Sequence, residues 1–126
     1  MSISHNTDTE VYQYPVLIIG SGAAGAKAAI ELERNGVDPL VISKRRLGDA
    51  HTTWARGGIN ASLGSLDPED TWQIHAADTL DEGHFINDPQ AVSQVCKNMP
   101  SVIHELDKWG MEFNKTEDGK INQRYF

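Results

Sequence analysis

The chain has 126 residues, of which 39% are hydrophobic, and it carries a formal net charge of −7. This length suits one domain with a modest core, and the acidic balance argues against nucleic acid or an acidic membrane surface as the main partner. The single cysteine excludes an internal disulfide, no histidine spacing suits a metal, and no stretch approaches the ~20 apolar residues of a membrane span.

The first predicted elements form a β-α-β unit. Residues 1–14 are polar, lack the features of a signal peptide and are expected to form a flexible amino-terminal segment. An apolar run predicts a strand over Val16–Ile19. An alanine-rich amphipathic segment then predicts a helix over about Ala23–Arg34, ended by Gly36. A second strand over Leu40–Ser43 completes the unit.

A glycine-rich turn joins the first strand to the helix, with the spacing Gly20-x-Gly22-x-x-Gly25. The first glycine permits a tight turn, the second lets the backbone approach a pyrophosphate, and the third lets the helix lie close to the strand. The free amides at the start of the helix would face the phosphates. Such a spacing alone can be an ordinary loop, but the flanking strand and helix favour dinucleotide binding. The residues predicted to bind are Gly20, Ser21, Gly22, Ala23, Ala24 and Gly25.

The second strand ends in Ser43 and Lys44. Domains that bind NAD usually carry an acidic residue here, about 20 residues after the glycine turn, to hold a ribose hydroxyl. A hydroxyl and an ammonium can replace that carboxylate only where the ligand presents acceptors. This observation weakens the case for NAD and leaves room for FAD.

Residues 44–66 contain four glycines and are predicted to form a long irregular segment. Loops of this length inside a compact domain are usually functional. Gly57 and Gly58 would let the backbone pass against a flat ring, and the hydroxyls of Thr52 and Thr53 could donate to phosphate or ring carbonyls. The alternative is a glycine turn in a surface loop.

The remaining sequence predicts helices. Residues 67–70 suggest a helix start, with Asp67 as the cap and Pro68 in the first turn, and this helix would run to Gly83. A second helix would start at residues 87–89. Pro100 is expected to break it, leaving a third helical stretch that ends near Gly110.

Residues 111–121 resemble a hairpin that folds at residues 117–119. Only two parallel strands are found, whereas a doubly wound dinucleotide domain has about five or six. The sequence also reaches Phe126 without a helix stop or closing turn. The prediction is therefore that residues 15–126 form the amino-terminal, incomplete part of a Rossmann-like α/β domain in a longer chain.

Taken together, these motifs closely resemble the flavoprotein subunit of the succinate dehydrogenase and fumarate reductase family. The shared blocks, in order, are G-S-G-A-A-G, S-K, H-T-T-W-A-R-G-G-I-N-A, D-T-W-Q-I-H-A-A-D-T-L, N-D-P-Q-A-V and the segment from E-L-D-K-W-G to N-Q-R-Y-F. They extend from Val16 to Phe126. The resemblance implies an FAD-binding domain of an enzyme that interconverts succinate and fumarate by hydride transfer to or from FAD. Electrons would pass to an iron–sulfur subunit and quinone.

The resemblance also implies roles for single residues. In the family, the histidine that matches His51 bonds covalently to a methyl carbon of the flavin ring and raises its reduction potential, which suits a neutral, nucleophilic imidazole. Phe126 matches an aromatic residue beside the dicarboxylate pocket, although a buried aromatic at a strand end is nearly as good a reading. The other implied cofactor contacts are Ser43, Lys44, Thr52, Thr53, Gly57 and Gly58.

The implied partners are a dicarboxylate substrate, an iron–sulfur subunit and membrane-anchor subunits. Neither nucleic acid nor direct membrane insertion is expected, so the protein would be cytoplasmic and peripheral on the inner face of the membrane. The family's catalytic arginine and substrate-binding histidines would lie beyond Phe126, so residues 1–126 alone should be inactive. The sequence departs from the family at Ala50, where Ser is usual, and at Arg56, where Gln is usual.

Two alternatives remain. An L-aspartate oxidase would be a soluble flavoenzyme that binds FAD non-covalently and usually has a small residue in place of His51. A non-enzymatic nucleotide-binding module would be favoured if 126 residues were a complete protein.

Overall fold

The computed structural model describes residues 10–55 and 58–125. The chain divides into two compact units, Met1–Gly57 and Gly58–Phe126. The first unit contains the glycine turn, and the second contains two long helices. Within the described ranges, no helix combines the length and the apolar character that a membrane span requires.

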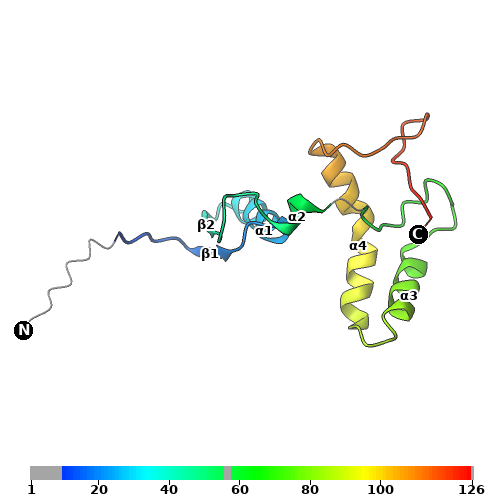
Figure 1. Ribbon diagram of the computed structural model, residues 1–126, viewed down its shortest axis with the longest axis horizontal. Coiled ribbons are helices and arrows are strands. Elements are labelled where there is room, and N and C mark those ends of the chain that lie inside the picture. Colours follow the sequence, from blue (N-terminus) through cyan, green and yellow to red (C-terminus); the bar gives the residue numbers. More distant parts are fainter. Residues whose placement is uncertain (1–9, 56–57, 126) are drawn as a thin grey trace, which may run out of the picture. The chain divides into compact units, whose positions relative to one another are not determined.

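The first unit is built on a parallel β-α-β arrangement (Figure 1). Strand β1 (Val16–Ile19) leads into helix α1 (Ala23–Arg34), which is followed by strand β2 (Pro39–Ile42). The two strands pair in parallel, with Val16 opposite Pro39. Gly36 adopts φ +72°, the left-handed conformation that commonly ends a helix. The predicted unit is confirmed, although β2 begins and ends one residue earlier than predicted.

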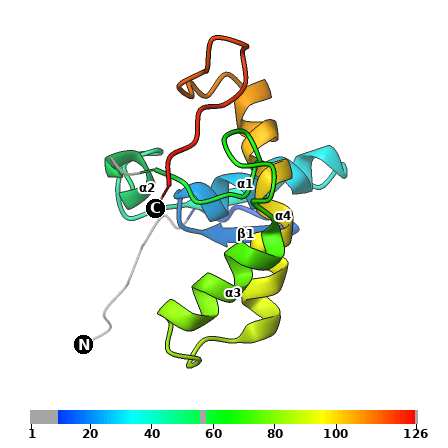
Figure 2. The same ribbon diagram turned by 90° about the vertical axis from the view of Figure 1, so that its right-hand side faces the viewer.

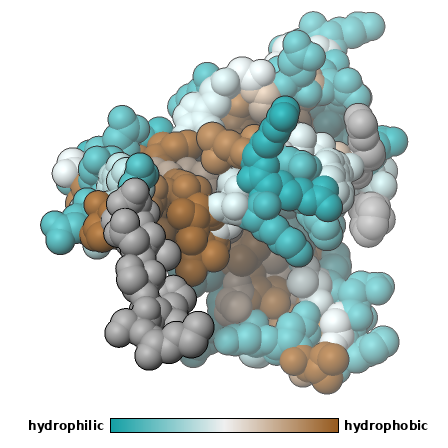
Figure 3. Space-filling model, turned by 60° about the vertical axis from the view of Figure 1, so that its left-hand side comes forward, coloured by the Kyte–Doolittle hydropathy of each residue, from teal (hydrophilic) through white to brown (hydrophobic). Residues whose placement is uncertain are grey.

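The two faces of the β1–β2 sheet differ. Successive side chains along a strand point to opposite faces. Ile18 lies on the face that α1 covers and is half-buried, whereas Leu17 and Ile19, which alternate with it, are 54% and 80% exposed. Figure 3 shows one face of the molecule on which hydrophobic side chains gather at the surface. One face of the sheet is therefore apolar and is not covered by any described element of the first unit itself.

The segment after β2 is more ordered than predicted. A turn closes where the Asp49 amide donates to the Arg46 carbonyl over 2.9 Å, and a short helix, α2 (His51–Trp54), follows. The prediction of an irregular segment throughout residues 44–66 is thus wrong for α2. A helix of four residues is too short to produce a detectable hydrophobic period.

The second unit is a pair of helices, α3 (Trp72–Glu82) and α4 (Pro89–Lys108), which lie side by side in Figures 1 and 2. The buried side chains Ala76 from α3 and Cys96 and Ile103 from α4 form the core between them. The α4 start was predicted correctly, because the Asp88 carboxylate accepts from the amides of Gln90 and Ala91.

Helix α3 starts later than predicted. Residues 67–70 form a separate turn, in which the Asp70 amide donates to the Asp67 carbonyl over 3.1 Å. Thr71 is the residue that caps α3, and its hydroxyl accepts from the Ile74 amide over 3.4 Å. The Asp67 side chain is engaged by the Glu69 amide, which explains why its capping signal produced a turn instead of a helix.

The predicted break at Pro100 is also wrong, because α4 continues through it as one helix of 20 residues. A proline inside a helix removes one backbone hydrogen bond and costs about 3 kcal/mol. Cys96 and Ile103, which flank Pro100, are each 2% exposed, and their burial against α3 offsets that cost.

The chain folds back at residues 117–119 as predicted, although the two described sides of this hairpin form no regular strands. The Thr116 amide donates to the Lys120 carbonyl over 2.8 Å, and one antiparallel bridge joins Lys115 to Ile121. Gln123 then links this segment to the loop before α3, accepting from the Ser65 amide and donating to the Ala61 carbonyl, both over 2.8 Å. These side-chain bonds, together with the backbone bond from the Asn122 amide to the Asn114 carbonyl, fix the carboxyl-terminal segment of the second unit.

Candidate functional site

The three glycines between β1 and α1 lie in different environments. Gly20 adopts φ +117°, which favours glycine. A Cβ atom on Gly25 would lie 2.0 Å from the Gly20 carbonyl oxygen, so α1 approaches β1 this closely only with glycine there. A Cβ atom on Gly22 would come no closer than 3.4 Å, to the Thr52 hydroxyl oxygen. Packing explains the glycine at 25 but not at 22, where both the N-cap position of α1 and room for a ligand are consistent with glycine.

The start of α1 offers backbone donors. The Ala23 amide donates to the Thr52 hydroxyl over 3.1 Å, so one of the amides predicted to face phosphate is already occupied. Within the described residues, the next two amides, those of Ala24 and Gly25, have no acceptor. The first turn of α1 also contains no acidic residue. Two free amides at the positive end of a helix dipole can bind an anionic group.

The two adjacent threonines of α2 have different partners. The Thr53 hydroxyl donates to the Gly48 carbonyl and closes the turn before α2. The Thr52 hydroxyl accepts from Ala23 and can still donate its own hydrogen. Of the two, only Thr52 lies at the start of α1.

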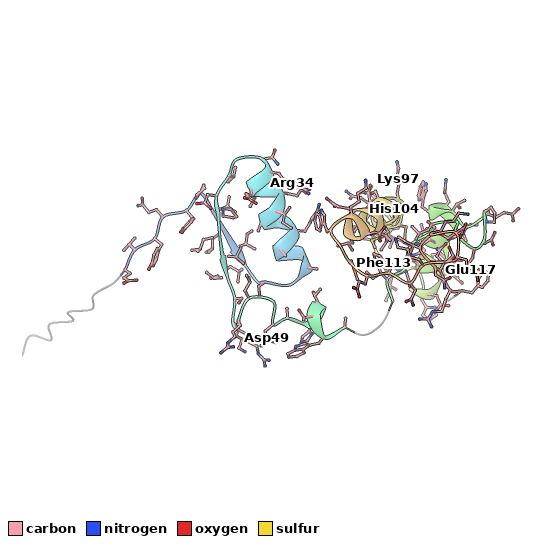
Figure 4. The ribbon with its side chains drawn as sticks, turned by 90° about the horizontal axis from the view of Figure 1, so that it is seen from above. Arg34, Asp49, Lys97, His104, Phe113 and Glu117 are labelled. Carbon is pink, nitrogen blue, oxygen red and sulfur yellow. The ribbon has the colours of Figure 1, made fainter. Side chains whose placement is uncertain are left out.

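His51 precedes Thr52 and is exposed. Its ring stacks against Trp54, with centroids 5.5 Å apart and an angle of 28° between the planes. The Arg45 guanidinium carbon lies 5.2 Å from the centroid of the Trp54 ring. Trp54 was not predicted to contact the cofactor; the i,i+3 spacing of His51 and Trp54 was the available signal. Figure 4 marks this region by Asp49, which lies in the loop before α2.

An open pocket of about 400 Å³ lies at the carboxyl ends of the two strands. It is lined by Ile19, Gly20, Ile42, Ser43 and Lys44. Ligands of open α/β sheets bind outside the carboxyl ends of the strands. The Ser43 hydroxyl donates to the Arg45 carbonyl, whereas the Lys44 ammonium has no partner in the described part of the chain. Apolar walls and one such cation suit one end of a dinucleotide.

A second pocket, of about 300 Å³, lies in the second unit, beside His104 and Lys115. The Lys115 ammonium is 2.6 Å from an Asp107 carboxylate oxygen. Lys120, which also lines the pocket, is 3.1 Å from an Asp118 carboxylate oxygen, so both cations are already paired and neither is left for an anion.

Some predicted site residues fall elsewhere. Gly57, Arg56 and Phe126 lie outside the described residues. Gly58 belongs to the second unit and is exposed, and a Cβ atom there would meet nothing within 4 Å. The contacts predicted for these residues with flavin or substrate therefore stay predictions.

The family model described as FAD binding domain matches residues 15–126. The chain belongs to this family. The predicted α/β fold of an FAD-binding domain is thus confirmed, and so is the resemblance to flavoprotein subunits through the relatives below.

The chain is 38% identical over 115 residues to the mitochondrial succinate dehydrogenase [ubiquinone] flavoprotein subunit of Oryza sativa subsp. japonica, covering 91% of this chain and 18% of that protein. It is 39% identical over 120 residues to one of the subunits of the fumarate reductase (CoM/CoB) of Methanothermobacter marburgensis, covering 94% and 22%. A chain in the structure of the Mycobacterium smegmatis Sdh1 complex in the apo form is 38% identical, with a TM-score of 0.86, covering 90% of this chain and 19% of that one. The chain therefore spans about a fifth of the length of the curated relatives it matches.

Proposed function

We propose that this chain is the amino-terminal part of the flavoprotein subunit of a succinate dehydrogenase or fumarate reductase. One observation carries the proposal: the Thr52 hydroxyl accepts from the first amide of α1, so His51 is one residue away from the phosphate-binding end of the helix. The similarity to subunits of succinate dehydrogenase and fumarate reductase over more than 90% of the chain supports it.

The residues present fit FAD. The free amides of Ala24 and Gly25 would donate to the pyrophosphate, and Gly22 would leave room for it. Ser43 and Lys44 would border the adenosine end, in the pocket at the strand ends. Ser21, Gly57 and Gly58 are proposed as further contacts. Bound FAD would supply the hydride acceptor or donor for succinate and fumarate.

His51 is proposed to hold the flavin covalently. Its neutral imidazole would use a ring nitrogen lone pair to form a bond to the ring methyl carbon of the flavin. The covalent bond would raise the reduction potential enough for succinate oxidation. Phe126 is proposed to lie beside the dicarboxylate.

The proposal extends to partners and location. An iron–sulfur subunit would accept the electrons and pass them to quinone, and membrane-anchor subunits would hold the protein in the cytoplasm, peripheral on the inner face of the membrane. Because the catalytic arginine and the substrate-binding histidines are proposed to lie beyond Phe126, residues 1–126 alone should not oxidise succinate with an artificial acceptor.

The decisive test is covalent flavin in the full-length protein. After acid precipitation and denaturing electrophoresis, the protein band should fluoresce, and His51→Ser should abolish that fluorescence. His104→Ser, which changes an exposed histidine in the second unit, is the matched control and should leave the fluorescence unchanged. Release of all the flavin from the unmutated protein would refute covalent attachment and favour an L-aspartate oxidase.

A second test concerns the phosphate site. Gly22→Ala adds a Cβ that the protein can accommodate, yet places it where the pyrophosphate would approach. FAD content should fall at least about tenfold, the loss that corresponds to about 1.4 kcal/mol of binding free energy. Ala28→Val, on the exposed side of α1, adds bulk away from the loop and should retain FAD. Normal flavin absorbance in a folded Gly22→Ala protein would contradict the assignment.

A further inference from the structure

The backbone around His51 is fixed from two sides. The Thr52 hydroxyl is bound by the Ala23 amide, and the Thr53 hydroxyl is bound to the Gly48 carbonyl. At the end of α2, the amide of the C-cap residue Ala55 donates to the His51 carbonyl over 2.9 Å. These bonds place the Cα atom of His51 but do not touch its side chain.

The imidazole itself is held only by aromatic stacking. Among the described residues, no hydrogen bond to either ring nitrogen accompanies the contact with Trp54. An exposed histidine without this contact would rotate freely among its side-chain rotamers. The stack at 5.5 Å and 28° therefore selects one orientation of the ring.

Trp54 has a support of its own. The Arg45 guanidinium carbon lies 5.2 Å from the indole centroid, within the range of a cation–π contact. Arg45 is in turn 3.7 Å from an Asp49 carboxylate oxygen. The charged pair from the loop before α2 thus holds the indole, and the indole holds the imidazole.

We infer that Trp54 is a positioning residue that orients the His51 imidazole for attachment to flavin, and that Arg45 fixes Trp54. This inference rests on the proposed function of His51. In the attachment step, the bond between the ring nitrogen and the flavin methyl carbon replaces one N–H and one C–H bond. The two electrons and the protons removed would pass to the flavin ring, and dioxygen or an iron–sulfur cluster of the proposed partner subunit would reoxidise it, with release of two protons to solvent. A nitrogen lone pair forms such a bond faster when its direction is already set.

The experiment compares attachment rates in the full-length apoprotein supplied with FAD. Trp54→Ala should lower the rate of covalent incorporation about fivefold, the factor expected for loss of one aromatic pair, while total bound FAD stays unchanged. Trp54→Phe should restore most of the rate because phenylalanine can still stack, and Arg45→Ala should give a smaller decrease than Trp54→Ala. Trp109→Ala is the matched control, since Trp109 is 45% exposed and Trp54 50%.

Reactivity of His51 in the apoprotein provides a measurement independent of flavin. Diethyl pyrocarbonate should modify His51 faster in Trp54→Ala than in the unmutated protein, because the stack shields one face of the ring. Unchanged attachment and unchanged modification in Trp54→Ala would overturn the inference. If the unmutated protein holds no covalent flavin, the proposed role of His51 is refuted. If diethyl pyrocarbonate then modifies His51 at the same rate in the unmutated apoprotein and in the Trp54→Ala apoprotein, the orientation of His51 by Trp54 is refuted as well.

Discussion

The two units of the chain differ in how they are buried. Among the described residues, every fully buried hydrophobic side chain belongs to the second unit, where Ala76, Cys96, Ile103 and Ile121 are 2–8% exposed. Helix α1 of the first unit contributes no buried residue, and no described element of that unit covers the second face of its sheet. The helix pair thus supplies its own core, whereas the first unit would gain stability from whatever covers its sheet or binds at its candidate cofactor site.

The largest effect that separates the units is expected from Ile103→Ala. Ile103 is 2% exposed between α3 and α4, so its truncation should cost about 2–5 kcal/mol. Hydrogen exchange of the amides of α3 and α4 in the full-length protein should accelerate accordingly, while FAD content of the folded fraction is retained. Val95→Ala, at a 57% exposed position of the same helix, should change stability by less than about 0.5 kcal/mol. Equal effects of both changes would show that this core does not stabilise the unit.

Gly25→Ala should destabilise the first unit instead of the second. The added Cβ would lie 2.0 Å from the Gly20 carbonyl oxygen, and moving α1 away from β1 should cost about 1–3 kcal/mol. Thermal unfolding of the apoprotein should show the loss, together with weakened FAD binding. Gly22→Ala is the contrasting variant, because it should lose FAD without losing apoprotein stability. Apoprotein stability unaffected by Gly25→Ala would mean that the close approach of helix and strand is unnecessary.

Pro100→Ala should increase the stability of the second unit, whose core is better buried. The change restores an amide that can donate to the Cys96 carbonyl, while it adds conformational freedom to the unfolded chain. The net expectation is a gain of about 1–2 kcal/mol, measured by hydrogen exchange along α4. A loss of stability would show that the rigidity of the proline is worth more than the missing hydrogen bond.

Ala50→Ser should give the smallest effect, in the less buried unit. Ala50 is the N-cap of α2 and supplies no side-chain acceptor; the Thr53 amide already donates to its carbonyl, whereas a serine hydroxyl could accept from the Thr52 amide. The helix should gain about 0.5–1 kcal/mol, seen as slower exchange of that amide. Ala55→Ser at the other end of α2 is the matched control and should produce no such slowing.

The fold prediction succeeded for elements that depend on residues close in the sequence and failed for elements that depend on contacts between distant residues. β1, α1 and the left-handed Gly36 depend on neighbouring residues, so their limits were predicted closely. The path through Pro100 depends on burial against α3, which the local signal of a proline cannot reveal. The start of α3 was missed because Asp67 and Thr71 are both good caps, and only the folded chain decides which one serves.

The candidate site shows the same division. The spacing of the glycines predicted the tight packing at Gly25, which is a local steric requirement. The bond between Ala23 and Thr52 spans 29 residues, and the sequence offered Thr52 and Thr53 as equal candidates. The different partners of the two hydroxyls follow from the turn at Gly48, which the sequence did not specify.

The hydrogen bond between Thr52 and the start of α1 links the folding of the glycine turn to the proposed attachment of flavin. His51 reaches its place only when the glycine turn has formed and its first amide has found the Thr52 hydroxyl. Under the proposed attachment, a misfolded loop would leave the histidine away from the flavin, and no bond would form. The covalent flavin would then act as a permanent mark of correct folding, so that the labelled fraction of a preparation counts the molecules whose phosphate loop assembled properly.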